Sequence, residues 1–126
     1  MIHLFSIAKR YCTHDKHESP PMSATDRVPS KILKHVYVGS KVHAKSKALL
    51  QQLNITHILN CTPPKSVDPE NGCPNYFEKE SWVKYKRIPI FDNVGEDIIS
   101  HMASAIEFID IAQHYGAVLV HCHKVD

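Results

Sequence analysis

The sequence predicts an α/β fold in which a central sheet of mixed and parallel strands is flanked by helices. Short runs of β-branched and apolar residues alternate along the chain with segments whose apolar residues recur at helical spacing. The pair Ile58-Leu59 places apolar side chains on both faces of one strand, as a buried parallel strand requires. With 126 residues, of which 43% are hydrophobic and 22% charged, the chain has the size and composition of a single globular domain.

The N-terminal half is predicted to hold an extension, two strands and a helix. Residues 1–27 mix charged residues and histidines without a regular period, so we expect a disordered extension there and a folded part at 28–126. Ser30–Leu33 and Val36–Gly39 are short strand-like runs. A helix is predicted next from four apolar residues at helical spacing: Ala44, Ala48, Leu49 and Leu53. Asn54 is expected to end this helix, because asparagine tolerates the left-handed conformation.

The C-terminal half continues with two strands, a long helix and a last strand. The predicted strands Ile55–Thr62 and Tyr85–Ile90 are separated by a long polar loop that is rich in proline. The clearest helix is expected at Asp97–His114, with Gly116 ending it. Its predicted buried stripe consists of apolar residues at helical spacing: Ile98, Met102, Ala105, Ile106, Ile109 and Ala112. Ala117–Cys122 then reads as a short apolar strand.

Composition and charge argue against several classes of function. With a net charge of +2 and no basic stripe, there is no case for nucleic acid as a partner. The nearest basic cluster is interpreted as a solvated helix face: Lys41, His43, Lys45 and Lys47. No segment reaches the ~20 apolar residues of a membrane span, and the apolar N-terminal segment is too short for a signal peptide. We therefore expect a soluble cytoplasmic protein, with the nucleus as a second location. In that reducing compartment the cysteines are expected to be thiols: Cys12, Cys61, Cys73 and Cys122.

The last strand carries the strongest chemical signal, because it ends on His121-Cys122. A strand that delivers a His-Cys pair into a loop is how cysteine-dependent phosphatases present their nucleophile. With the order of the other elements, the chain resembles the dual-specificity protein phosphatases, a branch of the protein tyrosine phosphatase superfamily. The resemblance covers about Val28 to Lys124 and is carried by these segments: Val36–Ser40 with Ala44, Ile55–Asn60, Tyr85–Asn93, Phe108–Asp110 and Val118–Cys122.

The resemblance implies the cysteine-based phosphatase fold and a covalent mechanism without metal or cofactor. Cys122 is the implied nucleophile and forms a phosphocysteine, while Asp92 is the implied general acid. His121, His123 and Lys124 fall on positions of the phosphate-binding loop, where His121 is expected to orient the loop rather than transfer protons. The implied substrate is a protein that carries phosphotyrosine, phosphoserine or phosphothreonine, with a protein kinase among the candidates; no membrane is involved.

The sequence departs from the family signature after the cysteine. That signature is His-Cys, five residues, and then Arg followed by Ser or Thr; here the residues after Lys124 are Val125 and Asp126, so the loop glycine and the arginine are absent. Since the loop amides and the arginine hold the phosphate and stabilise the thiolate, we expect an incomplete domain without useful catalysis. Without the family's C-terminal helices, we also expect the apolar side chains of Ala117–Cys122, Ile58 and Leu59 to lie in water.

Several readings of these residues remain open. A non-catalytic pseudophosphatase, acting as an interaction module, is the alternative to an enzyme. Cys122 alone is compatible with a small buried hydrophobe, and Asp92 with a turn former. His121-Cys122-His123 is also a candidate set of metal ligands, but no second Cys/His pair lies at the spacing of a zinc site. In the long loop, the aromatic residues either line a substrate cleft or pack onto the sheet: Tyr76, Phe77 and Trp82.

Overall fold

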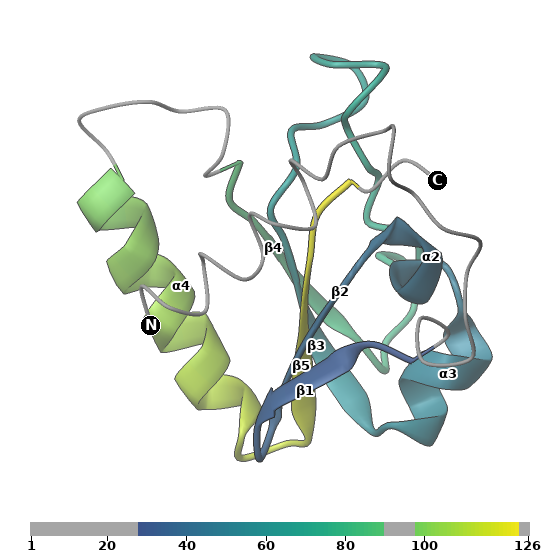
Figure 1. Cartoon of the computed structure of the whole chain (residues 1–126), viewed down its shortest axis with the longest axis vertical. Helices are drawn as coiled ribbons and strands as arrows, with labels where there is room; N and C mark the ends of the chain where they lie inside the picture. The colour runs from purple at the N-terminus through teal and green to yellow at the C-terminus, as the bar shows by residue number, and fades with distance from the viewer. Residues whose placement is uncertain (1–27, 90–97, 124–126) are drawn as a thin grey trace.

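The computed structural model describes residues 28–89 and 98–123. They form a five-stranded sheet in the order β1-β2-β5-β3-β4, with helices on both faces (Figure 1). The elements are β1 (Ser30–Leu33), β2 (Val36–Gly39), α2 (Lys41–Ala44), α3 (Lys47–Gln52), β3 (Ile55–Asn60), β4 (Lys84–Arg87), α4 (Ile98–Ala112) and β5 (Ala117–His121). β1 pairs antiparallel with β2, whereas the other three pairings are parallel, so the predicted α/β class with a mixed sheet is confirmed.

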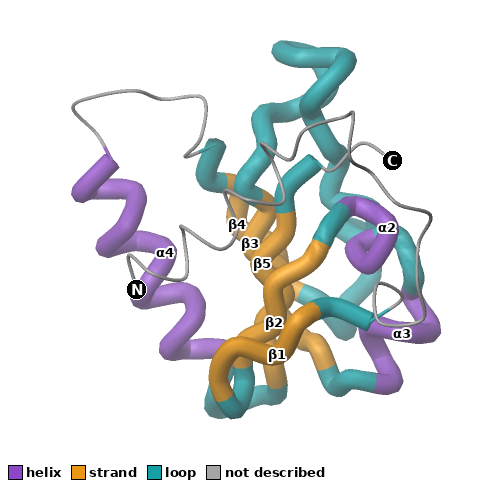
Figure 2. The backbone as a smooth tube through the Cα atoms, in the orientation of Figure 1, coloured by secondary structure: helices purple, strands orange, loops and turns teal. Residues whose placement is uncertain are grey.

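The two faces of the sheet are covered by different helices. α4 lies against one face, and α2 and α3 lie against the other (Figures 1 and 2). On the α4 face a buried cluster includes Val118 and Val120 of β5 together with Ala105 and Ile109 of α4. On the opposite face, Leu119 packs with residues that include Leu50 of α3 and Ile58 of β3. Neighbouring residues of β5 therefore point into two separate cores, as expected for a central parallel strand.

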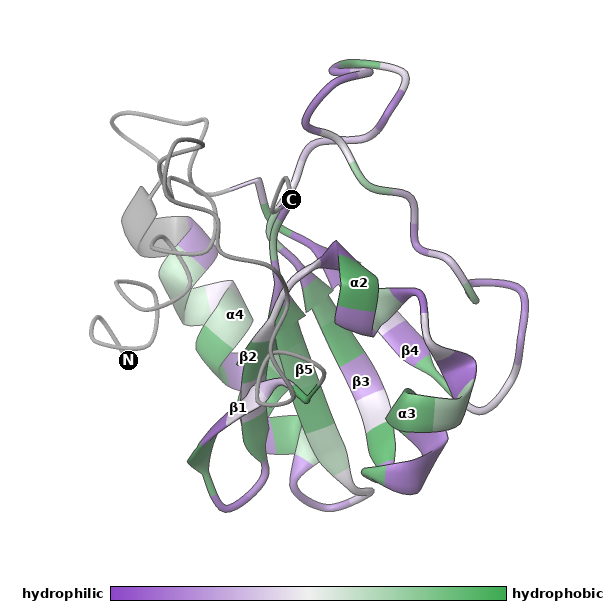
Figure 3. Cartoon of the chain, turned by 45° about the vertical axis from the view of Figure 1, so that its right-hand side comes forward, coloured by the Kyte–Doolittle hydropathy of each residue, from purple (hydrophilic) through white to green (hydrophobic). Residues whose placement is uncertain are grey.

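The expectation that this sheet would leave apolar side chains in water is wrong. Ile58, Leu59 and Leu119 are all 0% exposed, and so are Val118 and Val120. The reason is that α4 covers one face of the sheet, while the long loop adds aromatic side chains to the cover that α2 and α3 give the other face. Figure 3 shows β5 as a mostly apolar strand, whereas β3 carries both apolar and hydrophilic residues. The described part of the chain thus contains a closed pair of cores.

The helix predicted between β2 and β3 is two short helices. Ser40 caps α2, and Ser46 interrupts the helical run by capping α3, where its hydroxyl accepts a hydrogen bond from the backbone N–H of Leu49 at 3.4 Å. Serine favours a cap over a helix interior, because its hydroxyl competes for backbone groups. The break also changes which side chain is buried: Leu50 is fully buried, while Ala48 of the predicted stripe is exposed.

Two single-residue predictions in this region have opposite outcomes. Asn54 has φ of 57°, so the predicted left-handed residue before β3 is confirmed. The interpretation of the basic cluster as a solvated helix face is wrong for His43, which is only 4% exposed. His43 is buried because its ring closes the capping box of α2 by binding a backbone amide, whereas Lys45 and Lys47 are exposed.

The remaining elements follow the prediction closely. The strands expected at 55–62 and 117–122 each end one or two residues earlier than predicted, at Asn60 and His121. α4 matches its predicted span, and its described stripe buries Ala105, Ile109 and Ala112. Gly116 joins α4 to β5 where a Cβ atom would lie 2.5 Å from the carbonyl oxygen of Asn54, so only glycine fits this approach. The expected extension at 1–27 lies outside the described residues.

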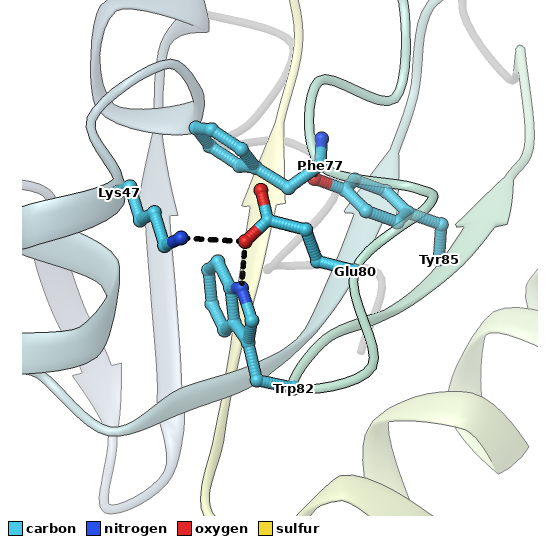
Figure 4. A network of polar contacts seen from close by, with 5 residues as sticks. All are labelled: Lys47, Phe77, Glu80, Trp82 and Tyr85. Carbon is cyan, nitrogen blue, oxygen red and sulfur yellow. Dashed lines mark hydrogen bonds and ion pairs between the residues drawn. The ribbon is translucent and has the colours of Figure 1, made fainter.

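The aromatic residues of the long loop pack on the sheet (Figure 4). The rings of Phe77 and Trp82 lie 5.8 Å apart, and the Tyr85 hydroxyl accepts a hydrogen bond from the Phe77 amide at 3.0 Å. Glu80 Oε1 accepts from Trp82 Nε1 at 2.9 Å and from Lys47 Nζ of α3 at 2.6 Å. Of the two interpretations of these aromatic residues, packing onto the sheet is therefore confirmed for Phe77 and Trp82. The bond between Glu80 and Lys47 joins the loop to α3.

Two classes of feature are absent from the described residues. No helix within 28–89 and 98–123 has the length and apolar character to cross a membrane. In the same residues, no three side chains of His, Cys, Asp or Glu come together in an arrangement that would bind a metal ion.

Candidate active site

The carboxyl ends of three parallel strands meet at one edge of the sheet. In the strand register, His121 of β5 lies opposite Gly39 of β2 and opposite Asn60 of β3. The ladder continues one step further, because the backbone N–H of Cys61 donates to the carbonyl oxygen of His121 at 2.9 Å. Cys122 is therefore the first residue past the central strand, at the edge where open α/β sheets bind their ligands.

Cys122 is completely buried at this edge. It is in no disulfide, and the same holds for Cys61 and Cys73, so the prediction of thiols is confirmed for these three; Cys12 lies outside the described residues. The backbone that leads to Cys122 is held by the pairing of β5 with two neighbouring strands. The nucleophile predicted from the sequence is thus placed by β5, a strand whose five residues are all buried.

His121 is fully buried beside the cysteine. Its Nδ1 donates to the carbonyl oxygen of Cys122 at 3.3 Å, whereas Nε2 has no hydrogen-bond partner within the described part of the chain. Burial, followed by the nearby Arg87 and His43, lowers the pKa of His121 to about 4, although the hydrogen bond to Cys122 opposes this. The ring is therefore neutral near pH 7 and is poorly suited to act as an acid. Its expected role in orienting the loop stays a prediction.

His43 fixes the first turn after β2 and was not predicted as a site residue. Its Nδ1 accepts a hydrogen bond from the backbone N–H of Ser40 at 3.0 Å. The ring lies so close to β2 that a Cβ atom on Gly39 would be 2.4 Å from Nδ1. Glycine at position 39 therefore lets the histidine reach across the strand end that pairs with His121.

A buried polar network at the end of β3 was also missed by the sequence prediction. The Asn60 amide oxygen accepts from the backbone N–H and hydroxyl of Thr62 at 3.0 and 2.6 Å. Its amide nitrogen donates to the Cys73 carbonyl oxygen and to Asn75, both at 3.0 Å. Arg87 Nη1 donates to the same Cys73 oxygen at 2.8 Å. These bonds tie the long loop to the strand ends next to Cys122.

His123 is the only other described residue of the predicted phosphate loop beyond Cys122. Lys41 Nζ of α2 donates to His123 Nε2 at 3.2 Å; since an ammonium group only donates, this nitrogen of His123 carries no proton in that contact. His123 also lines a pocket of about 270 Å³ with seven other residues: Lys41, Lys45, Lys65, Glu70, Gly72, Pro74 and Tyr76. The predicted Asp92 and Lys124 lie outside the described residues.

Comparison with known proteins identifies the arrangement. Residues 36–124 match the family described as "Dual specificity phosphatase, catalytic domain". The chain belongs to the dual-specificity phosphatases. The match contains β2 through β5 and the His121-Cys122 pair, so the family resemblance and the fold predicted from the sequence are both confirmed.

Curated relatives with this name align with most of the chain. Dual specificity protein phosphatase 9 of Homo sapiens is 38% identical over 105 residues, which is 82% of this chain and 25% of the relative. Dual specificity protein phosphatase 4 of Gallus gallus is 41% identical over 95 residues, or 75% of this chain and 23% of the relative. Dual specificity protein phosphatase 1 of Mus musculus has the same identity and the same two shares. The chain thus spans about a quarter of the length of each of these proteins.

Proposed function

We propose that this chain supplies the nucleophile of a dual-specificity protein phosphatase site, with phosphorylated proteins as substrates. The observation that carries the proposal is the position of Cys122, at the carboxyl end of the central strand and directly after His121. Family membership supports the reaction class, and the relatives' names state dual specificity. A phosphorylated protein kinase is one candidate substrate.

In the proposed reaction Cys122 attacks phosphorus as a thiolate. The Sγ–P bond forms while the bond from phosphorus to the tyrosine, serine or threonine oxygen breaks, and Asp92 protonates that leaving oxygen. The Asp92 carboxylate then takes a proton from water as the water oxygen attacks phosphorus. The Sγ–P bond breaks, which releases inorganic phosphate and restores the Cys122 thiolate and the protonated Asp92. His121 stays neutral in this scheme, because burial lowers its pKa. Its Nδ1 donates a hydrogen bond to the Cys122 carbonyl oxygen.

The proposal has a chemical requirement that residues 123–126 do not meet. The phosphoryl oxygens carry about −1.5 to −2 charges and need backbone amides and an arginine fork. The four residues after Cys122 are His, Lys, Val and Asp, so they contain neither the family's glycine nor its arginine. We therefore expect the 126 residues by themselves to hydrolyse an aryl phosphate only at the background rate.

A chimera tests the proposal. The residues after Cys122 are replaced by the corresponding segment of human dual specificity protein phosphatase 9, and aryl phosphate hydrolysis is measured. We expect turnover that disappears in Cys122→Ser and persists in the matched control Cys61→Ser, which alters another buried thiol. Turnover that is unaffected by Cys122→Ser would contradict the assignment of the nucleophile.

The interaction module remains the second candidate, and one observation favours it. Both faces of the sheet are covered within the described residues, so the packed unit does not depend on a phosphate loop. A chimera that folds but shows no turnover, while the 126-residue chain still binds a protein partner, would favour this candidate over the enzyme.

A further inference from the structure

We propose that the pocket beside Cys122 binds an anionic oxygen group, a carboxylate or a second phosphoryl group, on a peptide residue that flanks the phosphorylated one. This inference rests on the proposed function and adds a specificity site to it. The pocket is called the lysine pocket below and is lined by Lys41, Lys45, Lys65, Glu70, Gly72, Pro74, Tyr76 and His123.

The lysine pocket is formed by three parts of the chain that meet at the active edge. Lys41 and Lys45 belong to α2 and the residue that follows it, Lys65 and Tyr76 belong to the long loop, and His123 follows Cys122. The pocket volume of about 270 Å³ is near the lower end of the range for small-molecule sites, which suits one side chain rather than a cofactor.

The loop wall of the pocket is closely packed at Gly72 and hydrogen-bonded at Cys73. Gly72 has no room for a Cβ atom, which would lie 2.6 Å from the Asp68 carbonyl oxygen and 2.7 Å from that of Pro63. The next residue, Cys73, is held from both ends, since its N–H donates to the Thr62 hydroxyl and its carbonyl oxygen accepts from Asn60 and Arg87. Because this part of the wall is held before a ligand arrives, less backbone has to be ordered on binding.

The charges that face the pocket favour an anion. Three lysines and one carboxylate, Glu70, line it, and a second carboxylate, Asp68, lies near His123. Asp68 is occupied by its own loop, because it accepts from the backbone amides of Glu70 and Asn71 and from the Asn71 side chain; these bonds lower its pKa. The negative charge of Asp68 is therefore partly satisfied by its own loop. Among the described residues that line the pocket, three lysines outnumber one carboxylate.

The pocket lies within one residue of the nucleophile along the chain. His123 lines the pocket and directly follows Cys122, and Cα atoms of consecutive residues are about 3.8 Å apart. A group seated against His123 and Lys41 therefore belongs to a substrate residue close to the one whose phosphate meets Cys122. Cationic groups at this distance select among peptides by the charge that flanks the phosphoresidue.

The binding test uses the 126-residue chain and does not depend on catalysis. Three peptides of one sequence carry phosphoserine, glutamate or alanine at one position, and each is titrated while backbone amide shifts are recorded by NMR. We expect shifts at the lysine pocket with phosphoserine, smaller shifts with glutamate and none with alanine. In Lys65→Gln the phosphoserine peptide should bind roughly 3- to 10-fold more weakly, as expected for one lost charge-assisted contact.

Lys84→Gln is the matched control, because this exposed lysine lies near the opposite end of the sheet, where it pairs with His57. The proposal would be overturned if Lys65→Gln and the parent bound the phosphoserine peptide with equal affinity. It would also be overturned if Lys84→Gln lost as much affinity for this peptide as Lys65→Gln. Equal shifts with all three peptides would also overturn it, and the comparison of phosphoserine with glutamate separates the two sources of the anion. The binding test needs no turnover, whereas the proposed function is tested by turnover of the chimera, so failure of this site and failure of the proposed function give different results.

Discussion

Gly39→Ala should destabilise the chain by forcing His43 away from the end of β2. The new Cβ would lie 2.4 Å from His43 Nδ1 and 3.0 Å from the Cβ of Pro29. Overpacking of this kind costs about 1–3 kcal/mol, and losing the hydrogen bond from the Ser40 amide adds about 0.5–1.5. Since Gly39 does not need a positive φ, alanine recovers about 0.4–1 kcal/mol from the unfolded state. The net expected loss in the free energy of unfolding is about 1–3 kcal/mol.

A double-mutant cycle isolates the clash from other effects of the substitution. In the His43→Ala background the ring is gone, so adding Gly39→Ala should cost at most about 0.5 kcal/mol, and the coupling should be about 1–2 kcal/mol. Gly116→Ala is the matched control: its Cβ would meet the Asn54 carbonyl oxygen at 2.5 Å, near the other end of β5. Its cost should be the same with and without His43.

Urea unfolding measures the parent and all five variants through the fluorescence of Trp82, the single tryptophan, which packs against the sheet. The m-value should stay constant, which shows that the unfolding transition remains two-state. If Gly39→Ala costs as much without His43 as with it, the histidine is not what requires glycine at this position. The account of how the strand end beside His121 is shaped would then be wrong.

Three further predictions concern His121, the Asn60 network and the proposed general acid. Because the pKa of His121 is lowered from 6.5 to about 4 in the folded state, the unfolded chain binds a proton at this residue first as the pH falls. The contribution of His121 to the free energy of unfolding should therefore be full above pH 6.5 and decline towards pH 4. Unfolding measured as a function of pH should show that His121→Gln removes this part of the decline. Asn60→Ala removes the hydrogen bonds that the Asn60 side chain makes with the amide and hydroxyl of Thr62 and with the Cys73 carbonyl oxygen. It should lower the free energy of unfolding by about 2–4 kcal/mol in urea, and an unchanged value would contradict the network. In a catalytically competent chimera, Asp92→Asn should reduce turnover by about 10²–10⁴-fold, most strongly for poor leaving groups, and a variant as fast as its parent would exclude Asp92 as the acid.

The sheet was predictable because its signals are local. The β-branched run of β2 and the apolar run before Cys122 identify strands at short range, and the two-sided apolar pair Ile58-Leu59 identifies a buried one. Asn54 could be assigned from its own backbone preference. The nucleophile position followed from the motif His121-Cys122 at the end of such a strand.

The features that sequence reasoning missed depend on partners that are distant in the chain or on competing local choices. Asn60 binds residues 13 and 15 positions later, and nothing near Asn60 in the sequence marks it as buried. Ser46 was predicted to lie inside one helix, because the apolar residues on both sides of it recur at helical spacing. Its side chain instead caps α3, which ends the helical run before it. The closed cores were missed because the cover provided by α4 and by the loop aromatics is a matter of tertiary packing.

The structure separates two tasks that a phosphatase site combines. The position of Cys122 is set by β2 and β3, whose ends pair with His121, and by the glycine and histidine that shape the turn after β2. None of these elements depends on how the phosphoryl charge is neutralised, which is the task of loop amides and an arginine after the cysteine. It follows that variants at Gly39 and Asn60 should alter stability and the placement of the thiol together, whereas a grafted loop should change turnover and leave the pairing of β5 intact.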